Sequence, residues 1–378
     1  MKGARFYSIF LFCFMFSHLA ASPLFQGQWS NWFNMNQSDA FAYQYGTRYI
    51  PQLSGETDYF TGTRLDFEAS LNNLVYISDH SGTHETYGVF ELHRLWFRLS
   101  AEQYEIRAGL QKINFGSASL FRPLMWFDRM DARDPLQLTQ GVWGVLGKYY
   151  FLQNHTIWAW GLLGNKDPKG WEIFGTSSSE PEFGGRIQFA VPRGELAFTT
   201  HFRKANATFA FFGIRIPGQL SIREKRFGLD GKWDLKLGLW FEGVLIHQDL
   251  PISDYKIREL LTLGADYTFD LGNGLYVMAE HFSVNISDKV LKRGTTSKLT
   301  ALSMMYPLGI LDQISLLSYV DWENSQFYQL INWQRSYDHW QWIVLAFLNP
   351  ETASVLQFDS EHHSYSGKGI QIMLVFNH

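Results

Sequence analysis

Cysteine is almost absent from this chain: among 378 residues only Cys13 carries a thiol, and it lies in the first apolar run. Internal disulfides are therefore impossible, which excludes the disulfide-rich secreted scaffolds. Basic residues are not in excess, because 32 Lys and Arg stand against 36 Asp and Glu and the net charge is −4. No strongly basic face follows from this balance, so we expect no nucleic-acid partner. The glycines form no phosphate-cradling motif, and we expect no cofactor and no metal.

Long apolar runs are absent after the N-terminus, which predicts no membrane-spanning helix further along. The N-terminus itself reads "MKGAR", then the apolar "FYSIFLFCFMFSHLA", then the small residues "AAS". This order of basic, apolar and small residues is typical of a secretory signal peptide. A transmembrane anchor is the weaker alternative, because the run is shorter than the ~18–20 residues needed to span a bilayer. We predict a signal peptide over residues 1–22 and one domain over residues 23–378.

Alternation with a period of two dominates the rest of the chain. Aromatic residues make up 17%, yet mean hydropathy is only −0.16. In "RLDFEASLN", for example, one face carries Leu65, Phe67, Ala69 and Leu71, and the other carries Arg64, Asp66, Glu68 and Ser70. Successive side chains of a strand point to opposite faces, so such segments are strands with one apolar and one polar face. The segments "GLYVMAEHF", "SKLTALSMMY" and "FYQLINWQR" depart from this pattern, because they have apolar residues on both faces.

A soluble sandwich would also contain alternating strands, but three features favour a membrane barrel. The segments run to about 10 residues or more, aromatics gather at their ends, and the polar face is charged. A closed barrel also pairs every backbone group, as lipid requires. The fold class is thus all-β: a transmembrane antiparallel up-and-down β-barrel of roughly 18 strands, with 16 as the alternative count. The predicted strands are 26–35, 41–52, 63–77, 89–100, 104–113, 141–151, 154–164, 183–192, 194–204, 223–233, 234–248, 257–269, 274–286, 297–306, 312–322, 325–336, 339–349 and 369–377.

The connections alternate in length, which predicts the orientation of the barrel. Tight turns at 101–103 and 272–273 alternate with long connections such as 114–140 and 165–182. Outer-membrane barrels have short periplasmic turns and long external loops. Both termini are then expected to be periplasmic, and the strand number even.

Four segments carry a resemblance to a known family: "TRYIPQLS", "RAGLQKINFG", "FRPLMWFDRMDARDP" and "GVWGVLGKYYF". Over residues 41–151 the chain resembles porin-like outer-membrane proteins of Gram-negative bacteria, with a Bacteroidetes-type, alginate-export-like or general-porin character. The resemblance implies a place in the cell outer membrane, among its lipid and lipopolysaccharide, and passage of small hydrophilic solutes. It also implies recognition of the last strand, with Phe376, by the barrel-assembly machinery. Porins are often trimers, so a homotrimer is one expected assembly.

The connection 114–140 is the third external loop in this strand count, and the resemblance implies that it folds into the lumen and narrows it. Rings of opposed charge select solutes in such constrictions. The residues predicted to form this pore constriction are Arg122, Asp128, Arg129, Asp131, Arg133 and Asp134. The alternative is a set of structural salt bridges that anchors the loop and filters nothing.

Neighbouring strands should direct further charges inward. The predicted lumen wall contains Arg94, Arg98, Glu105, Arg107, Arg186 and Arg203. Arg94 and Arg98, with Arg107 on the next strand, could form a basic ladder that favours anions. The interpretation that we prefer is a set of lumen charges neutralised by carboxylates. The carboxylates available for this are Asp66, Glu68, Glu242, Asp266 and Glu280.

Enzymatic function is not expected and no catalytic residue is assigned. His201 and His281 lie on strands, but no Ser and acid group accompanies them in a distinctive arrangement. The predicted function is an outer-membrane porin, giving passive diffusion through a water-filled lumen narrowed by loop 114–140. An export barrel for an acidic polysaccharide and a non-transport structural barrel are the alternatives.

Overall fold

The computed structural model describes residues 23–38, 40–80, 82–130, 134–207, 220–250, 255–351 and 365–378. The signal peptide predicted over residues 1–22 lies outside these ranges. Eighteen strands follow one another: β1 Leu24–Gln37, β2 Phe41–Phe60, β3 Thr63–His80, β4 Thr83–Ala101, β5 Tyr104–Gln111, β6 Val142–Tyr150, β7 Thr156–Leu162, β8 Glu182–Val191, β9 Gly194–Ala207, β10 Leu220–Asp234, β11 Gly238–Gln248, β12 Ile257–Phe269, β13 Leu275–Ser287, β14 Thr295–Pro307, β15 Asp312–Asp321, β16 Gln326–Ser336, β17 Trp340–Leu348 and β18 Lys368–Asn377. Among the described residues, no helix is long and apolar enough to cross a membrane.

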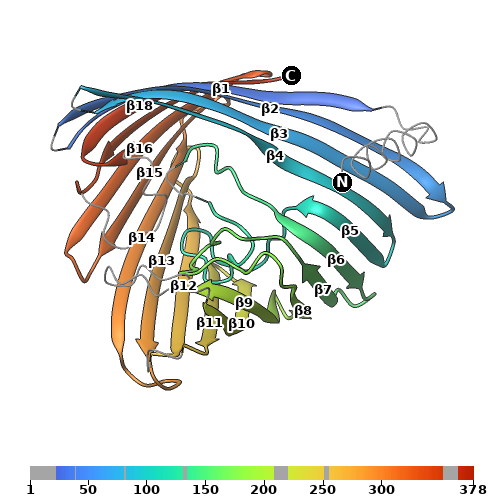
Figure 1. The fold of residues 1–378 in the computed structure, drawn as a ribbon. Coiled ribbons are helices and arrows are strands. Elements are labelled where there is room, and N and C mark those ends of the chain that lie inside the picture. The colour runs from blue at the N-terminus through green and yellow to red at the C-terminus, as the bar shows by residue number, and fades with distance from the viewer. Residues whose placement is uncertain are drawn as a thin grey trace.

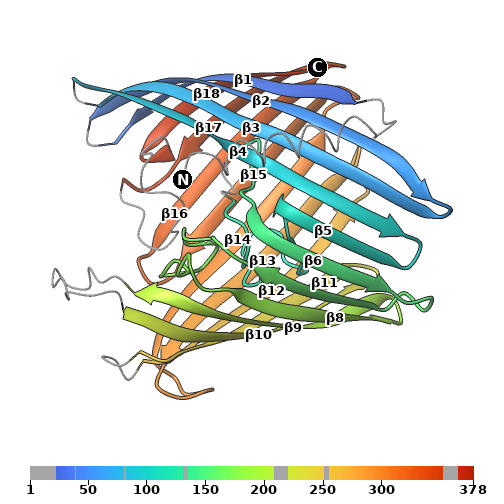
Figure 2. The ribbon, with the colours of Figure 1, turned by 45° about the vertical axis from the view of Figure 1, so that its right-hand side comes forward.

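The strands form one closed antiparallel barrel (Figures 1 and 2). Each strand pairs with its neighbours in the sequence, and β1 closes the sheet by pairing with both β2 and β18. Gly27 and His378 exchange backbone hydrogen bonds of 3.0 Å, so the first and last strands meet at one end of the barrel. The predicted fold class and the count of 18 strands are confirmed.

Apolar side chains cover the outer face, as the alternation predicts. Leu261 and Leu263 on β12 are 41% and 52% exposed, while Thr262 between them is completely buried inside the barrel. Exposed aromatics stand near the strand ends, among them Tyr149, Phe151, Tyr267, Phe269, Trp340 and Trp342. An apolar outer band flanked by aromatic residues is the pattern of a barrel surrounded by lipid.

Strand length differs markedly around the barrel. Strands β2, β3 and β4 have 20, 18 and 19 residues, whereas β5, β6 and β7 have 8, 9 and 7. The prediction for β4 was wrong at its start, because this strand begins at Thr83 and not at residue 89. The exposed half of β4 carries Thr, His and Glu at its beginning, which weakens the apolar alternation there.

Candidate functional site: the loops inside the barrel

The connection between β5 and β6, residues 112–141, enters the barrel and crosses to the opposite wall (Figure 1). Its backbone is held by two buried carboxylates on that wall. Glu280 of β13 accepts the backbone N–H groups of Ser119 at 2.7 Å and of Phe121 at 2.7 Å. Glu242 of β11 accepts those of Ala118 at 2.7 Å and Leu124 at 3.0 Å. A coil segment has no strand to pair with, so carboxylates satisfy the buried backbone donors that would otherwise be costly.

Apolar side chains of the same segment form a core inside the barrel. Phe115, Phe121, Leu124, Trp126 and Phe127 are all at most 7% exposed and belong to one buried cluster. The wall contributes inward-facing apolar residues to this cluster: Leu146, Trp160, Val244, Ile246, Leu260, Phe282, Leu299, Ala301, Tyr319, Tyr328 and Leu330. The expectation that the inner face is charged throughout is therefore wrong for this part of the wall.

This core explains the strands whose sequences are apolar on both faces. Phe282 lies in "GLYVMAEHF", Leu299 in "SKLTALSMMY" and Tyr328 in "FYQLINWQR". Their outer faces belong to the apolar outer band, and their inner faces meet the inserted loop. Phe121, for example, stacks on Phe282 with 5.6 Å between ring centroids. A strand that lies between two apolar surfaces loses its alternation.

A second long connection, residues 163–181, joins the first inside the barrel. The Trp171 indole donates to the Arg122 carbonyl oxygen at 3.0 Å, and the Gly170 N–H donates to the Asp128 carbonyl oxygen at 2.8 Å. Glu172 forms ion pairs with Arg203 at 3.0 Å and with Arg226 at 2.5 Å. Sequence reasoning missed this role; the available signal was a second long loop with its own tryptophan and paired charges.

The predicted constriction residues are divided between two environments. Arg122 is 7% exposed and donates to the carbonyl oxygen of Phe115 at 3.2 Å and to the Asn114 side chain. Asp128 is 1% exposed, and burial raises the pKa of its carboxyl group. Arg129 and Asp134, in contrast, line an open cavity. Asp131 and Arg133 lie outside the described residues.

The predicted wall residues all have polar partners. Arg98 binds Asp66 through two donors, with an ion pair of 2.7 Å. Arg107 and Glu105 pair at 3.0 Å. Arg94 lies on β4 with Arg98. It donates to the carbonyl oxygen of Thr139 at 3.0 Å and to the hydroxyl oxygen of the same residue at 2.8 Å.

The other two wall arginines belong to the packed side of the interior. Arg186 pairs with Asp230 at 2.6 Å, and both side chains are at most 2% exposed. Arg203 pairs with Glu224 at 2.6 Å. Asp66 acts as a neutralising carboxylate as expected, whereas Glu242 and Glu280 hold the inserted loop.

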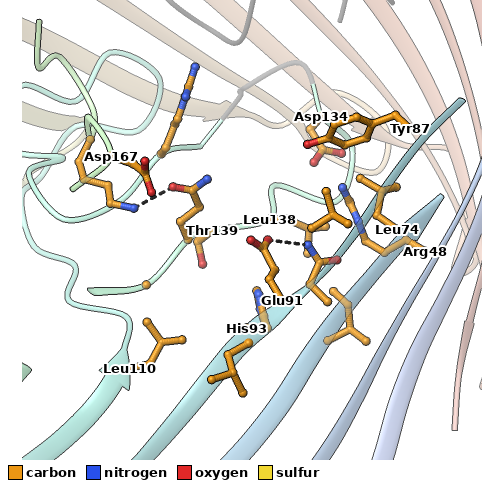
Figure 3. Close-up of a pocket in the computed structure, with 18 of the residues that line it drawn as sticks. Arg48, Leu74, Tyr87, Glu91, His93, Leu110, Asp134, Leu138, Thr139 and Asp167 are labelled. Atoms are coloured by element: carbon orange, nitrogen blue, oxygen red, sulfur yellow. Dashed lines mark hydrogen bonds between the residues drawn. The ribbon is translucent and has the colours of Figure 1, made fainter. Parts of the chain in front are cut away.

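A cavity of about 720 Å³ remains between the loops and the long strands (Figure 3). Figure 3 shows Arg48, Tyr87, Glu91 and Asp134 on the side of the strands, and Asp167 across from them. The charged side chains that line the cavity are Arg48, Arg129, Lys166, Lys169, Glu91, Asp134 and Asp167. Both signs of charge therefore face the same space.

The charges of this cavity are less neutralised than those of the packed side. The Arg48 guanidinium lies over the Trp32 ring at 5.8 Å, and its Nε finds no hydrogen-bond partner in the described part of the chain. Lys169 donates to the neutral Gln140 at 2.8 Å, and burial lowers the pKa of its ammonium group. Glu91 accepts from the neutral Asn72 at 3.0 Å. Such groups are available to a solute in a way that a buried ion pair is not.

His201, one of the two histidines considered for catalysis, is completely buried between Glu182 at 3.1 Å and the Trp160 indole at 3.1 Å. His281 faces outward and contacts Thr300 at 2.9 Å. Within the described ranges no group of three or more His, Asp or Glu side chains is placed to hold a metal ion.

Solved structures with this fold are outer-membrane proteins, among them porins. OccAB4 of Acinetobacter baumannii aligns with a TM-score of 0.56 at 8% identity, over 94% of this chain and 98% of its own. OccK5 (OpdH) of Pseudomonas aeruginosa aligns with a TM-score of 0.54 at 11% identity, over 94% and 97%. An anion-selective porin from Comamonas acidovorans aligns with a TM-score of 0.51 at 13% identity, over 95% and 100%. No family model matches the sequence, and no curated protein matches it. These similarities show a porin-like barrel fold.

Proposed function

We propose that this chain is an outer-membrane porin through which small hydrophilic solutes diffuse passively. The observation that carries the proposal is the partly filled interior: two loops occupy one side of the barrel, and a cavity lined by charges of both signs remains on the other. In this proposal the signal peptide directs export, both termini lie in the periplasm and the long loops face outward. The same proposal includes the resemblance of residues 41–151 to Bacteroidetes-type, alginate-export-like porins.

The loop 114–140 has two roles in the proposed porin. Its first part, up to Asp128, anchors the loop through Glu242, Glu280 and the apolar core. Its second part provides Arg129 and Asp134, with Asp131 and Arg133 between them, as the constriction. Because the lining has both signs of charge, we expect weak selectivity between anions and cations.

A planar-bilayer recording on the refolded full-length barrel tests this function. We expect stable single-channel steps, and we expect the charge swap Arg129→Glu to move the reversal potential in a salt gradient toward cation preference. Asp134→Arg should move it toward anion preference. Lys236→Glu, at an exposed turn on the far end of the barrel, is the matched control and should leave the reversal potential unchanged.

A closed structural barrel is the second candidate, because the apolar core inside the barrel is extensive. If the folded barrel gives no single-channel conductance steps in the bilayer, this candidate is favoured and the porin is overturned. An export barrel for an acidic polysaccharide would need a wider passage than the filled interior offers. It predicts large conductance that added polysaccharide blocks.

A further inference from the structure

The barrel wall has a step between β4 and β5. Strand β4 pairs with β5 only from Leu95 to Ser100, so on the side facing β5 the stretch from Thr83 to Arg94 has no strand beside it within the described ranges, although β3 pairs with its other side. Figure 2 shows β4 continuing well past the end of β5. Strands β6 and β7, next along the wall, are equally short.

The part of the step nearest to β5 lies where the outer surface is apolar. A seven-residue strand with the usual rise and tilt covers about 18 Å, which is less than the apolar band of about 25 Å. Next to the ends of the short strands the exposed side chains are apolar: Phe90 is 77% exposed, Leu92 45%, Trp143 40% and Leu163 55%. Farther along the edge, from Thr83 to Thr86, the exposed side chains are polar. The part of the step beside Phe90 and Leu92 therefore faces the apolar outer band.

The cavity reaches this step from inside. Its lining includes the inward-facing Arg48 and Glu91, but also Leu92, Leu110 and Trp143. By register these three residues lie on the outer side of the wall: Leu110 and Trp143 are register partners, and Leu92 is the partner of Leu71 on the apolar face of β3. Leu92 and Trp143 are exposed there, whereas Leu110 is buried. The cavity therefore reaches the wall at the end of β5. In Figure 3, Leu110 lies at the same end of the cavity as His93 and Glu91.

The chemistry of this opening matches an amphiphile. The free edge of β4 leaves backbone donors and acceptors unpaired, and hydrocarbon cannot satisfy them. Water or a polar group must therefore occupy the cavity side of the step, while an acyl chain fits the apolar outer side. The four basic and three acidic side chains around the cavity suit a headgroup with both charges.

We propose that the gap between β4 and the short strands β5–β7 is a lateral portal, which takes the zwitterionic headgroup of a single-chain amphiphile into the cavity and leaves its chain in the lipid. This proposal rests on the outer-membrane location that the proposed function assumes. It adds a second, sideways route into a barrel that solutes enter from the mouth.

Photo-crosslinking in vesicles tests the portal. The probe is a lysophosphatidylethanolamine with a photoreactive group on its chain, incubated with the refolded full-length barrel. We expect labels to concentrate on residues 87–93 and 141–143, with peptide 257–269 of β12 as the lipid-facing control. The double variant Arg48→Gln, Glu91→Gln should lower the concentrated labelling by about tenfold, because charged hydrogen bonds to the headgroup are lost. Heat-modifiable migration on a gel checks that the variant is folded.

Several outcomes would overturn the portal. Labelling spread evenly over the lipid-facing peptides would do so. So would equal labelling by a glycerophosphoethanolamine probe that carries the photoreactive group in place of the chain, since that headgroup would enter from the mouth. Equal labelling by a lysophosphatidic acid probe would overturn the zwitterionic headgroup. Conductance of the same preparation separates the two proposals: even labelling of a conducting barrel removes only the portal, and concentrated labelling of a non-conducting barrel removes only the porin.

Discussion

The two sides of the barrel interior use the same kinds of residue in opposite ways. On the packed side the arginines are buried against carboxylates, as in the pair Arg186 and Asp230, with both side chains at most 2% exposed. On the cavity side Arg48 rests on an aromatic ring. A buried ion pair has its field cancelled and its geometry fixed, whereas a charge facing water keeps its field. The comparison shows that the environment created by the inserted loops, and not the number of lumen charges, decides which of them a solute meets.

The largest expected effect comes from removing the support of the packed side. Glu280→Ala deletes an acceptor that serves the backbone of Ser119, Leu120 and Phe121 and also the Trp240 indole. Each of these four donors costs about 1–3 kcal/mol if it stays buried without a partner, which sums to about 4–12 kcal/mol. Because a detached loop lets water reach some of them, we expect a loss near the lower end, about 4–5 kcal/mol. The loop should detach from β13, and single-channel conductance should rise.

The matched control for that variant is Glu259→Ala. Glu259 also accepts two hydrogen bonds, from Asn285 at 2.8 Å and from the Leu291 N–H at 2.7 Å, but it lies half-buried near the start of β12 and holds the exposed turn between β13 and β14. It should change conductance and the temperature of unfolding little. Equal effects of the two substitutions would show that Glu280 does not hold the loop in a special way.

The next effect in size distinguishes the two sides: a variant on the cavity side should change ion selectivity, and a variant on the packed side should change stability. Arg48→Gln removes a positive charge from the cavity, so we expect the reversal potential to shift toward cation preference at unchanged stability. Arg186→Gln strands Asp230 inside the packed side, so we expect about 3–5 kcal/mol of destabilisation and an unchanged reversal potential. Reversal potentials and thermal gel shifts of both variants test the contrast. If the Arg186 variant changes the reversal potential and leaves the stability unchanged, the contrast between the two sides is wrong.

Much of the fold follows from the sequence because one physical rule repeats along it. A strand with lipid on one side and water on the other must alternate, and β9, which carries Thr199, His201 and Arg203 inward, was predictable for that reason. The pairing of Arg98 with Asp66 could also be predicted, because adjacent strands in an antiparallel barrel bring inward-facing residues together.

The inserted loops limit what the sequence can predict. Trp126 and Arg129 are three residues apart in one coil, yet one is buried in the core and the other lines the cavity. Coil has no period from which the side of a residue can be deduced. Phe282 was ambiguous for a related reason, because its inward partner, Phe121, comes from a segment far away in the chain. From the sequence alone, carboxylates such as Glu242 look like lumen charges. Their role in binding the loop backbone becomes visible only in the three-dimensional structure.

The smallest expected effect is a pH dependence at the boundary of the two sides, at Asp128. Burial raises the pKa of this carboxyl group, and its Oδ2 has no hydrogen-bond partner among the described residues. The folded state then holds a proton over a pH range in which the unfolded chain has lost it. The free energy of unfolding should fall as the pH rises from the ordinary Asp value near 3.9 through the raised value of the folded state.

The variant Asp128→Asn tests this pH dependence, because its amide group does not titrate. We expect it to be more stable than wild type at pH 8, by about 1 kcal/mol, and equal to it near pH 4. Unfolding temperatures of both proteins at pH 4, 6 and 8 measure the difference. Parallel curves would show that the buried carboxyl group carries no cost, and that the loop opens to water at Asp128 instead of at Arg129.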